Sequence, residues 1–131
     1  MANISAYFAK AGLDWVLGGA TPTQPASRLV GLSKGTPTSV SGSEVGTGSG
    51  YARQSGLFGA AASPAGSASN TAAMTFGPFS SSDAVQGIHI WDTISISSGN
   101  MLWYGTLQTA RTVLTGDTLV VAAGGLILTL S

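Results

Sequence analysis

GIHIWDTISISSGNMLWYGTL, residues 87–107, is the stretch that decides the fold, because it predicts two strands joined by a turn at residues 97–100. Side chains alternate along a strand, so Ile88 and Ile90 point to one face of the first arm and Trp91 to the other. The second arm also carries bulky side chains on both faces. A strand with one solvated face would alternate apolar with polar residues. This pair of strands is therefore predicted to be central in a sheet, or covered by a neighbouring subunit.

A helix is expected at residues 3–17. Apolar side chains recur there at spacings of three and four, which places them on one stripe of a helix. The stripe consists of Ile4, Tyr7, Phe8, Ala11 and Trp15. Asn3 is a suitable N-cap, and Gly18-Gly19 is a strong stop signal. We expect the stripe to pack against the β core, with Trp15 as a structural anchor. The alternative is that the stripe docks into a partner protein.

Short predicted strands with turn signals between them fill the rest of the chain. They lie at residues 27–33, 51–62, 68–76, 111–114, 118–123 and 125–130, with turns at 63–66 and 115–117. Residues 34–50 are rich in Gly, Ser and Thr and predict a long exposed loop. Regularly spaced short strands are typical of sandwiches and jelly rolls. We therefore predict a single all-β domain over residues 1–131, a jelly-roll-like β-sandwich of about eight strands with one short N-terminal α-helix.

The composition restricts the kinds of partner that the protein can have. Only 8% of the residues are charged and the net charge is zero, whereas about 25% is usual. A surface with so little charge does not keep copies apart, so we expect a homo-oligomer within an assembly. The five basic residues are scattered, and we expect no nucleic-acid partner. We also expect neither a secretory leader nor a membrane span.

The sequence offers no convincing reactive cluster, and an enzyme is not expected. Residues 31–35, GLSKG, match the serine-hydrolase elbow, but Gly35 and Pro37 prevent the helix that must follow Ser33. His89 is the single histidine and there is no cysteine, which excludes metal sites built from clusters of these residues. The carboxylates are dispersed; their spacing leaves a glycosidase pair open but does not favour one. We predict no catalytic residue, no metal and no cofactor.

Aromatic residues are the remaining candidates for binding. Trp91, Trp103 and Tyr104 could stack on sugars or pack against another protein, as aromatic side chains do at interfaces. The alternative is that all three pack in the core.

Several segments, taken in order, resemble a known family over nearly the whole chain. They are MANISAYFAKAGLDWVLGG at 1–19, GSGYARQ at 48–54, SASNTAAMTF at 67–76, GNMLWYGTLQTARTVLTGDTL at 99–119 and AAGGLILTLS at 122–131. The family consists of small structural proteins of tailed-bacteriophage virions, often labelled tail fibre or head decoration proteins. The most specific pieces are YARQ at 51–54 and NMLWYG at 100–105, which are signatures of fold and assembly. They add Tyr51 and Arg53 to Trp91, Trp103 and Tyr104 as candidate interface residues.

The resemblance implies a non-enzymatic structural component of a virion, assembled in the host bacterial cytoplasm. We expect a capsid decoration or cement protein that stabilises the head, because the chain lacks the heptads or repeats of a long trimeric stalk. The alternative is a small tail-fibre or baseplate component that contributes to host attachment, with sugar binding by its aromatic residues. An unrelated carbohydrate-binding module ranks third. The expected partners are capsid or tail proteins and further copies of this chain, a trimer being compatible.

Overall fold

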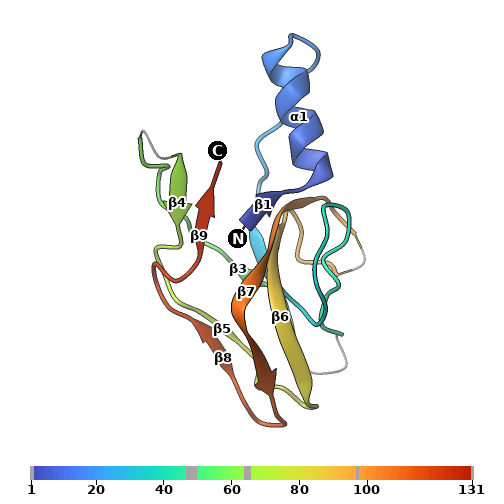
Figure 1. The fold of residues 1–131 in the computed structure, drawn as a ribbon, viewed down its shortest axis with the longest axis vertical. Coiled ribbons are helices and arrows are strands. Elements are labelled where there is room, and N and C mark those ends of the chain that lie inside the picture. Colours follow the sequence, from blue (N-terminus) through green and yellow to red (C-terminus); the bar gives the residue numbers. More distant parts are fainter. Residues whose placement is uncertain (1, 47–49, 64–65, 97, 131) are drawn as a thin grey trace.

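The computed structural model describes residues 2–46, 50–63, 66–96 and 98–130 (Figure 1). Its elements are β1 (Ala2–Ile4), α1 (Ala6–Val16), β2 (Leu29–Ser33), β3 (Gln54–Ser55), β4 (Ser67–Ser69), β5 (Met74–Phe76), β6 (Asp83–Trp91), β7 (Met101–Val113), β8 (Leu119–Val121) and β9 (Ile127–Thr129). The predicted all-β fold with one short N-terminal helix is confirmed.

The centre of the protein is a five-stranded sheet with the strand order β1-β7-β6-β2-β3. All its pairings are antiparallel. Both β6 and β7 lie between other strands, which confirms that the hairpin predicted from residues 87–107 is central. Ile88 and His89 on β6 and Leu102 on β7 are buried. The strand predicted separately at residues 111–114 corresponds to the end of β7. Residue 97 of the turn predicted at residues 97–100 lies outside the described residues.

Two ribbons, β4 paired with β9 and β5 paired with β8, take the place of a second large sheet. The apolar core joins sheet residues such as Val30 and Ile90 to Phe76 and Leu126 from these ribbons and their flanks. The strand predicted at residues 51–62 is reduced to β3 and isolated bridges, and the strand predicted at 68–76 divides into β4 and β5. Residues 64–65 of the turn predicted at 63–66 lie outside the described residues.

Residues 34–46 cover the face of the sheet that carries His89. Val45 is fully buried, and its backbone N–H donates to the carbonyl oxygen of Leu32 at 2.9 Å. Gly42 is also buried and lies directly against the His89 ring. Residues 34–46 are thus a loop that is buried at Pro37, Gly42 and Val45 and exposed at positions such as Val40, because small residues let the backbone approach the sheet closely. Residues 47–49 of the predicted loop lie outside the described residues.

The helix α1 projects from one end of the molecule (Figure 1). It begins later than predicted, because residues 2–4 form β1 and pair with residues 103–105 of β7. The N-cap is Ser5 instead of Asn3. Its hydroxyl accepts a hydrogen bond from the N–H of Phe8 at 3.1 Å and donates to the carbonyl oxygen of Met101. Serine and asparagine cap helices about equally well. The pairing of residues 2–4 with the edge of β7 therefore determines that the helix begins after Ser5. The helix ends before Gly18, as predicted.

Candidate functional site

Two of the five candidate interface residues, Tyr51 and Arg53, lie inside the protein. The Arg53 guanidinium makes two hydrogen bonds to the Glu44 carboxylate, Nε to Oε1 at 2.8 Å and Nη2 to Oε2 at 2.7 Å. The Arg53 side chain is 0% exposed and that of Glu44 is 10% exposed. The Tyr51 hydroxyl donates to the same Oε1 at 2.8 Å and accepts from the N–H of Leu32 at 2.8 Å. Burial removes Tyr51 and Arg53 from the surface, which corrects the prediction that they form an interface.

Arg53 also holds the loop between β6 and β7. Its Nη1 donates to the carbonyl oxygens of Thr93 at 2.8 Å and Ser95 at 2.7 Å. The guanidinium lies 4.3 Å from the ring centre of Trp91, a cation–π distance. The half-buried Trp91 donates its Nε1–H to Nδ1 of His89 at 2.8 Å. Glu44, Tyr51, Arg53, His89 and Trp91 thus form one connected group, called here the buried polar cluster.

His89 is enclosed on both sides. A Cβ added at Gly31 or Gly42 would come within 2.2 Å or 2.6 Å of its ring. Because Nδ1 accepts a hydrogen bond from Trp91, the neutral ring carries its proton on Nε2. Within the described structure, Nε2 has no hydrogen-bond partner. Burial, with a smaller contribution from Arg53, lowers the pKa of His89 to about 4, although Glu44 acts in the opposite direction. Burial and the Glu44 charge raise the pKa of Tyr51. Arg53 and His89 are buried, and the hydrogen bonds of the cluster are all made within the chain.

Trp103 and Tyr104 lie on β7 and are half-buried. The ring of Trp103 packs against Phe8 of α1, with 6.1 Å between the ring centres. Tyr104 is opposite His89 on β6 and opposite Asn3 on β1. The structure therefore brings Tyr51 and Arg53 together in the interior with the half-buried Trp91 next to Arg53, whereas Trp103 lies beside the helix.

The end of α1 is strongly apolar and strongly exposed. Its side chains Leu13, Trp15, Val16 and Leu17 are 61%, 62%, 71% and 78% exposed, and they are called here the apolar end of α1. No residue of α1 is buried. Of the predicted stripe, Phe8 packs against the core, and Trp15 is not the structural anchor that the stripe predicted. The physical reason is that α1 runs beyond the sheet, where its last turn has no surface to cover.

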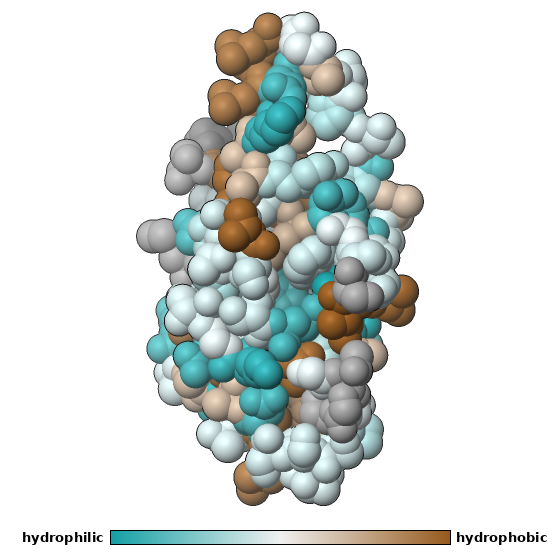
Figure 2. Space-filling view, turned by 90° about the vertical axis from the view of Figure 1, so that its right-hand side faces the viewer, coloured by the Kyte–Doolittle hydropathy of each residue, from teal (hydrophilic) through white to brown (hydrophobic). Residues whose placement is uncertain are grey.

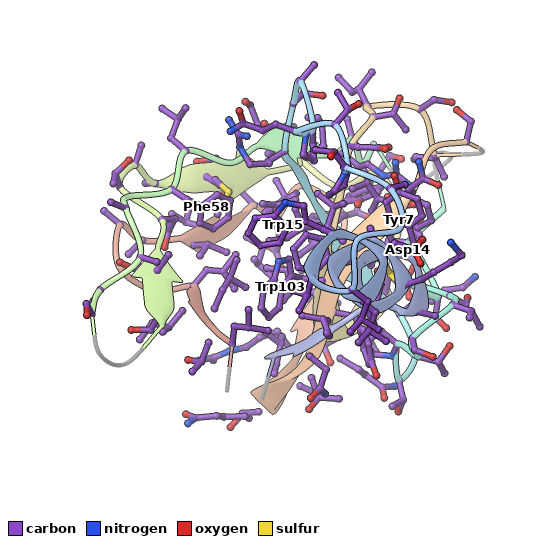
Figure 3. The ribbon with its side chains drawn as sticks, turned by 90° about the horizontal axis from the view of Figure 1, so that it is seen from above. Tyr7, Asp14, Trp15, Phe58 and Trp103 are labelled. Carbon is purple, nitrogen blue, oxygen red and sulfur yellow. The ribbon has the colours of Figure 1, made fainter. Side chains whose placement is uncertain are left out.

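The figures show the arrangement around this end. Hydrophobic side chains gather at the top of the molecule, over α1 (Figure 2). Seen from above, Trp15 and Trp103 lie on the side of α1 that faces Phe58, and Tyr7 and Asp14 lie on the opposite side (Figure 3). The aromatic residues labelled in this view come from α1 itself, from β7 and from the segment that contains Phe58.

A groove of about 790 Å³ follows β7 beyond the short stretch that β1 covers, and its other wall is the segment from β8 to β9. Aliphatic side chains such as Leu107 and Val121 and hydroxyl side chains such as Thr106 and Thr112 line it. None of the described residues lining it is aromatic, so it lacks the stacking platform that sugar-binding sites commonly use.

The described residues contain neither a group of metal ligands nor a membrane-spanning helix. Among residues 2–46, 50–63, 66–96 and 98–130, no group of three or more His, Asp or Glu side chains could hold a metal ion. In the same residues, no helix is both long enough and apolar enough to cross a bilayer.

Comparison with family models identifies the relatives of this chain. Residues 3–129 match the family described as Podophage GP4 fiber I protein gp80. The chain belongs to this family. A search of curated proteins found no match. The match to the fiber I family runs from β1 to β9 and includes both the buried polar cluster and α1. It confirms the predicted relation to phage virion structural proteins, and the protein is a structural component of a bacteriophage virion. The family description fits the tail-fibre alternative better than capsid decoration.

Two features of the structure were not predicted from the sequence patterns. Glu44 stands alone in a Gly/Ser/Thr-rich segment, and only the fold brings it to Arg53 and Tyr51. The exposure of the apolar end of α1 could have been predicted, because Trp15, Val16 and Leu17 are consecutive and cannot all lie on one stripe of the helix.

Proposed function

We propose that this protein is a small, non-enzymatic component of a podophage tail fibre that helps the virion attach to its host. The family match over residues 3–129 supports this proposal. The distribution of side chains agrees with it, because the protein buries its main polar cluster and exposes large apolar groups. Such a surface suits lasting contacts with other proteins better than the binding of charged small molecules.

The buried polar cluster supports a role without catalysis. Perturbed pKa values commonly mark active sites, and His89 and Tyr51 both have them. An active site, however, must admit a substrate, and His89 is 0% exposed. The shifted pKa values of His89 and Tyr51 are therefore explained by their burial in a polar network inside the protein.

The partners that we propose are tail proteins of the phage and further copies of this chain, with residues 1–131 as one domain assembled in the host cytoplasm. Trp103 and Tyr104 remain proposed contact residues, because each keeps part of its side chain at the surface. Trp91 is less suited to binding sugar, because one face of its ring is occupied by Arg53.

A capsid decoration protein is the second candidate, and the observation that favours it is the charge-poor composition of the chain. A flexible loop at residues 34–50 that adapts to a curved lattice would also suit a decoration protein. The packing of residues 34–46 on the sheet weakens this argument, because Val45 and Gly42 are already buried within the protein.

Phage particles that lack the protein separate the two roles. If the protein is a tail-fibre component, electron microscopy locates it on the tail of complete particles, and deficient particles adsorb poorly to host cells while their heads resist heat as well as complete heads do. Supplying the wild-type chain in trans should restore adsorption. Heads that burst at lower temperature, together with normal adsorption, would instead establish the decoration role.

A further inference from the structure

We propose that the outer edge of β7 beyond β1, residues 106–113, is a docking site for an extended segment of a different protein. The segment adds to the sheet as a further strand and carries an acidic residue that pairs with Arg111. This inference rests on the proposed function in one respect, since it gives the chemistry of the partner that holds the fibre component in the virion. It follows from the backbone of β7, from the walls of the groove beside it and from the charges of the chain.

The outer edge of β7 is only partly used within the chain. β1 pairs with residues 103–105 on this edge, whereas β6 pairs with the opposite edge from Met101 to Val113. Among the described residues, no third strand pairs with β7, and no loop residue there forms a backbone hydrogen bond with residues 106–113. The backbone groups on this part of the edge are therefore open to an added strand, whose affinity comes from main-chain hydrogen bonds.

The lining of the groove shows that it follows the edge of β7 and not one of its faces. A groove on one face of a strand would be lined by every second residue, because side chains alternate. Here residues 105–109 and 111–113 all line it. The opposite wall carries Val120 and Ile127, which are 58% and 60% exposed. An extended segment in the groove can thus bond to β7 and cover these apolar side chains with its own.

The charges in the groove indicate an acidic partner. Arg111 and Asp117 are the charged residues that line it. The Asp117 carboxylate accepts a hydrogen bond from the N–H of Leu114 at 2.9 Å. The exposed Arg111 side chain forms neither an ion pair nor a hydrogen bond with any residue that the structure describes. A carboxylate on the incoming segment supplies this partner, because a guanidinium can donate two parallel hydrogen bonds to it.

A second copy of this chain is a poor partner for this edge. Each of its five side-chain carboxylates already accepts a hydrogen bond within its own chain, namely those of Asp14, Glu44, Asp83, Asp92 and Asp117. Pairing between two identical β7 edges is also disfavoured, because residues 107–110 lie opposite Gln86 alone. Such a bulge bends the strand and discourages edge-to-edge association. The occupant is therefore a different protein, with a short extended segment of alternating apolar residues and at least one Asp or Glu.

The first test uses the synthetic peptide acetyl-SVTVEVSG-amide as the probe and nuclear magnetic resonance of the purified protein as the measurement. At millimolar peptide, the backbone amide signals of residues 106–113 should shift and their hydrogen exchange should slow. An analogue with lysine in place of glutamate should bind about fivefold more weakly, because an attraction to Arg111 becomes a repulsion. An analogue with proline in place of threonine should not bind, because proline cannot donate to a sheet.

A charge reversal on the protein supplies the matched control. Arg111→Glu should exchange the preference, so that the lysine peptide binds more tightly than the glutamate peptide. Lys34→Glu makes the same change of net charge at an exposed lysine that is not among the residues lining the groove. It should keep the preference of the wild-type protein.

The second test uses phage particles that carry the same two variants. Arg111→Glu should lower the amount of this protein retained in purified virions several-fold, because the acidic segment of the partner is then repelled. Lys34→Glu should leave the amount unchanged. Quantitative mass spectrometry of the particles measures both.

The docking site would be overturned if the glutamate peptide shifts no amide signal of residues 106–113, or if the glutamate and lysine peptides bind equally well. A wild-type protein that protects the same amides by dimerising would assign the edge to a second copy and overturn it as well. Failure of the proposed function gives a different result. Protein held on the head through Arg111 contradicts the tail-fibre role alone, whereas a tail that fully retains Arg111→Glu contradicts the docking site alone.

Discussion

The buried polar cluster and the apolar end of α1 reverse the usual distribution of side chains. In the cluster, Arg53 and Glu44 form an ion pair inside the protein, where their desolvation is costly. At the end of α1, Trp15 and its neighbours stand in water, where apolar surface is unfavourable. The cluster is nevertheless complete within one chain, because almost every polar atom has a partner. The apolar end has no partner within the described chain.

The comparison shows two ways in which a protein with few charges can use large side chains. Arg53 donates to Glu44, nine residues earlier, and to the carbonyl oxygen of Thr93, 40 residues later, so the cluster joins this part of the chain to the loop between β6 and β7. The apolar end contributes little to the fold of a single copy. Stability experiments should therefore find large effects in the cluster and small effects at the helix.

The largest effect is expected from Arg53→Met. The variant leaves Glu44 without its buried counter-charge, and breaking one side of a buried ion pair costs about 3–5 kcal/mol of the free energy of unfolding. Urea denaturation followed by tryptophan fluorescence measures this loss. The exposed Arg111→Met is the control and should change stability by less than about 0.5 kcal/mol. An equally small loss of stability in both variants would show that the fold does not depend on the buried polar cluster.

The next effect is a loss of stability in acid. The pKa of His89 is about 4 in the folded protein and about 6.5 in the unfolded chain. Between these values the unfolded chain binds more protons, so stability is full above pH 6.5 and falls as the pH drops toward 4. Linkage predicts a loss of about 2 kcal/mol between pH 7 and pH 5. Glu44 and Arg53 are the charged groups of the cluster around the ring.

Nuclear magnetic resonance provides a direct check, because His89 is the single histidine and its ring signals need no assignment. The signals should remain those of a neutral ring at pH 5.5. A midpoint near 6.5 in the folded protein would mean that the ring is hydrated, which would contradict the enclosure by Gly31 and Gly42.

A smaller effect is expected where α1 joins the sheet. Phe8→Ala removes the ring that packs against Trp103, and because Phe8 is only half-buried the cost should be about 1–2 kcal/mol, below the usual value for a core phenylalanine. Tyr7→Ala, which alters a ring that is 48% exposed on the same turn, is the control. Thermal unfolding should distinguish the two variants; equal shifts would mean that the junction does not depend on Phe8.

The smallest effect is expected at Trp15. Trp15 is exposed, so Trp15→Ala should lower the free energy of unfolding by less than about 0.5 kcal/mol, as is usual for exposed positions. A loss of about 3–5 kcal/mol, typical of a buried aromatic residue, would restore Trp15 as the anchor that the apolar stripe indicated. The midpoint of urea unfolding measures the difference.

The parts of the fold that depend on local pattern could be predicted from the sequence. The bulky residues on both faces of residues 87–107 indicated a central hairpin, and β6 and β7 are central. The helix was also expected, but its first residues were not placed correctly. Asn3 and Ser5 are both good caps, and the edge of β7, about 100 residues away in the sequence, favours Ser5.

The candidate site depends on tertiary contacts that sequence patterns do not contain. The resemblance singled out Tyr51 and Arg53 but could not show that Glu44 draws both into the interior. The stripe through Phe8 and Trp15 predicted packing for both, since periodicity gives the direction of a side chain and not the extent of the surface below it. The sheet reaches Phe8 and ends before Trp15.

The pairing of β1 with β7 has a consequence for the order of events during synthesis. The hydroxyl of Ser5 contacts the carbonyl oxygen of Met101, a residue 96 positions later in the chain. Contacts between residues so distant in sequence form late in folding, and in a growing chain they must wait for the second residue to leave the ribosome. The first segment to be made is thus among the last to be fixed, and the helix acquires its position on the sheet only when most of the chain has been translated.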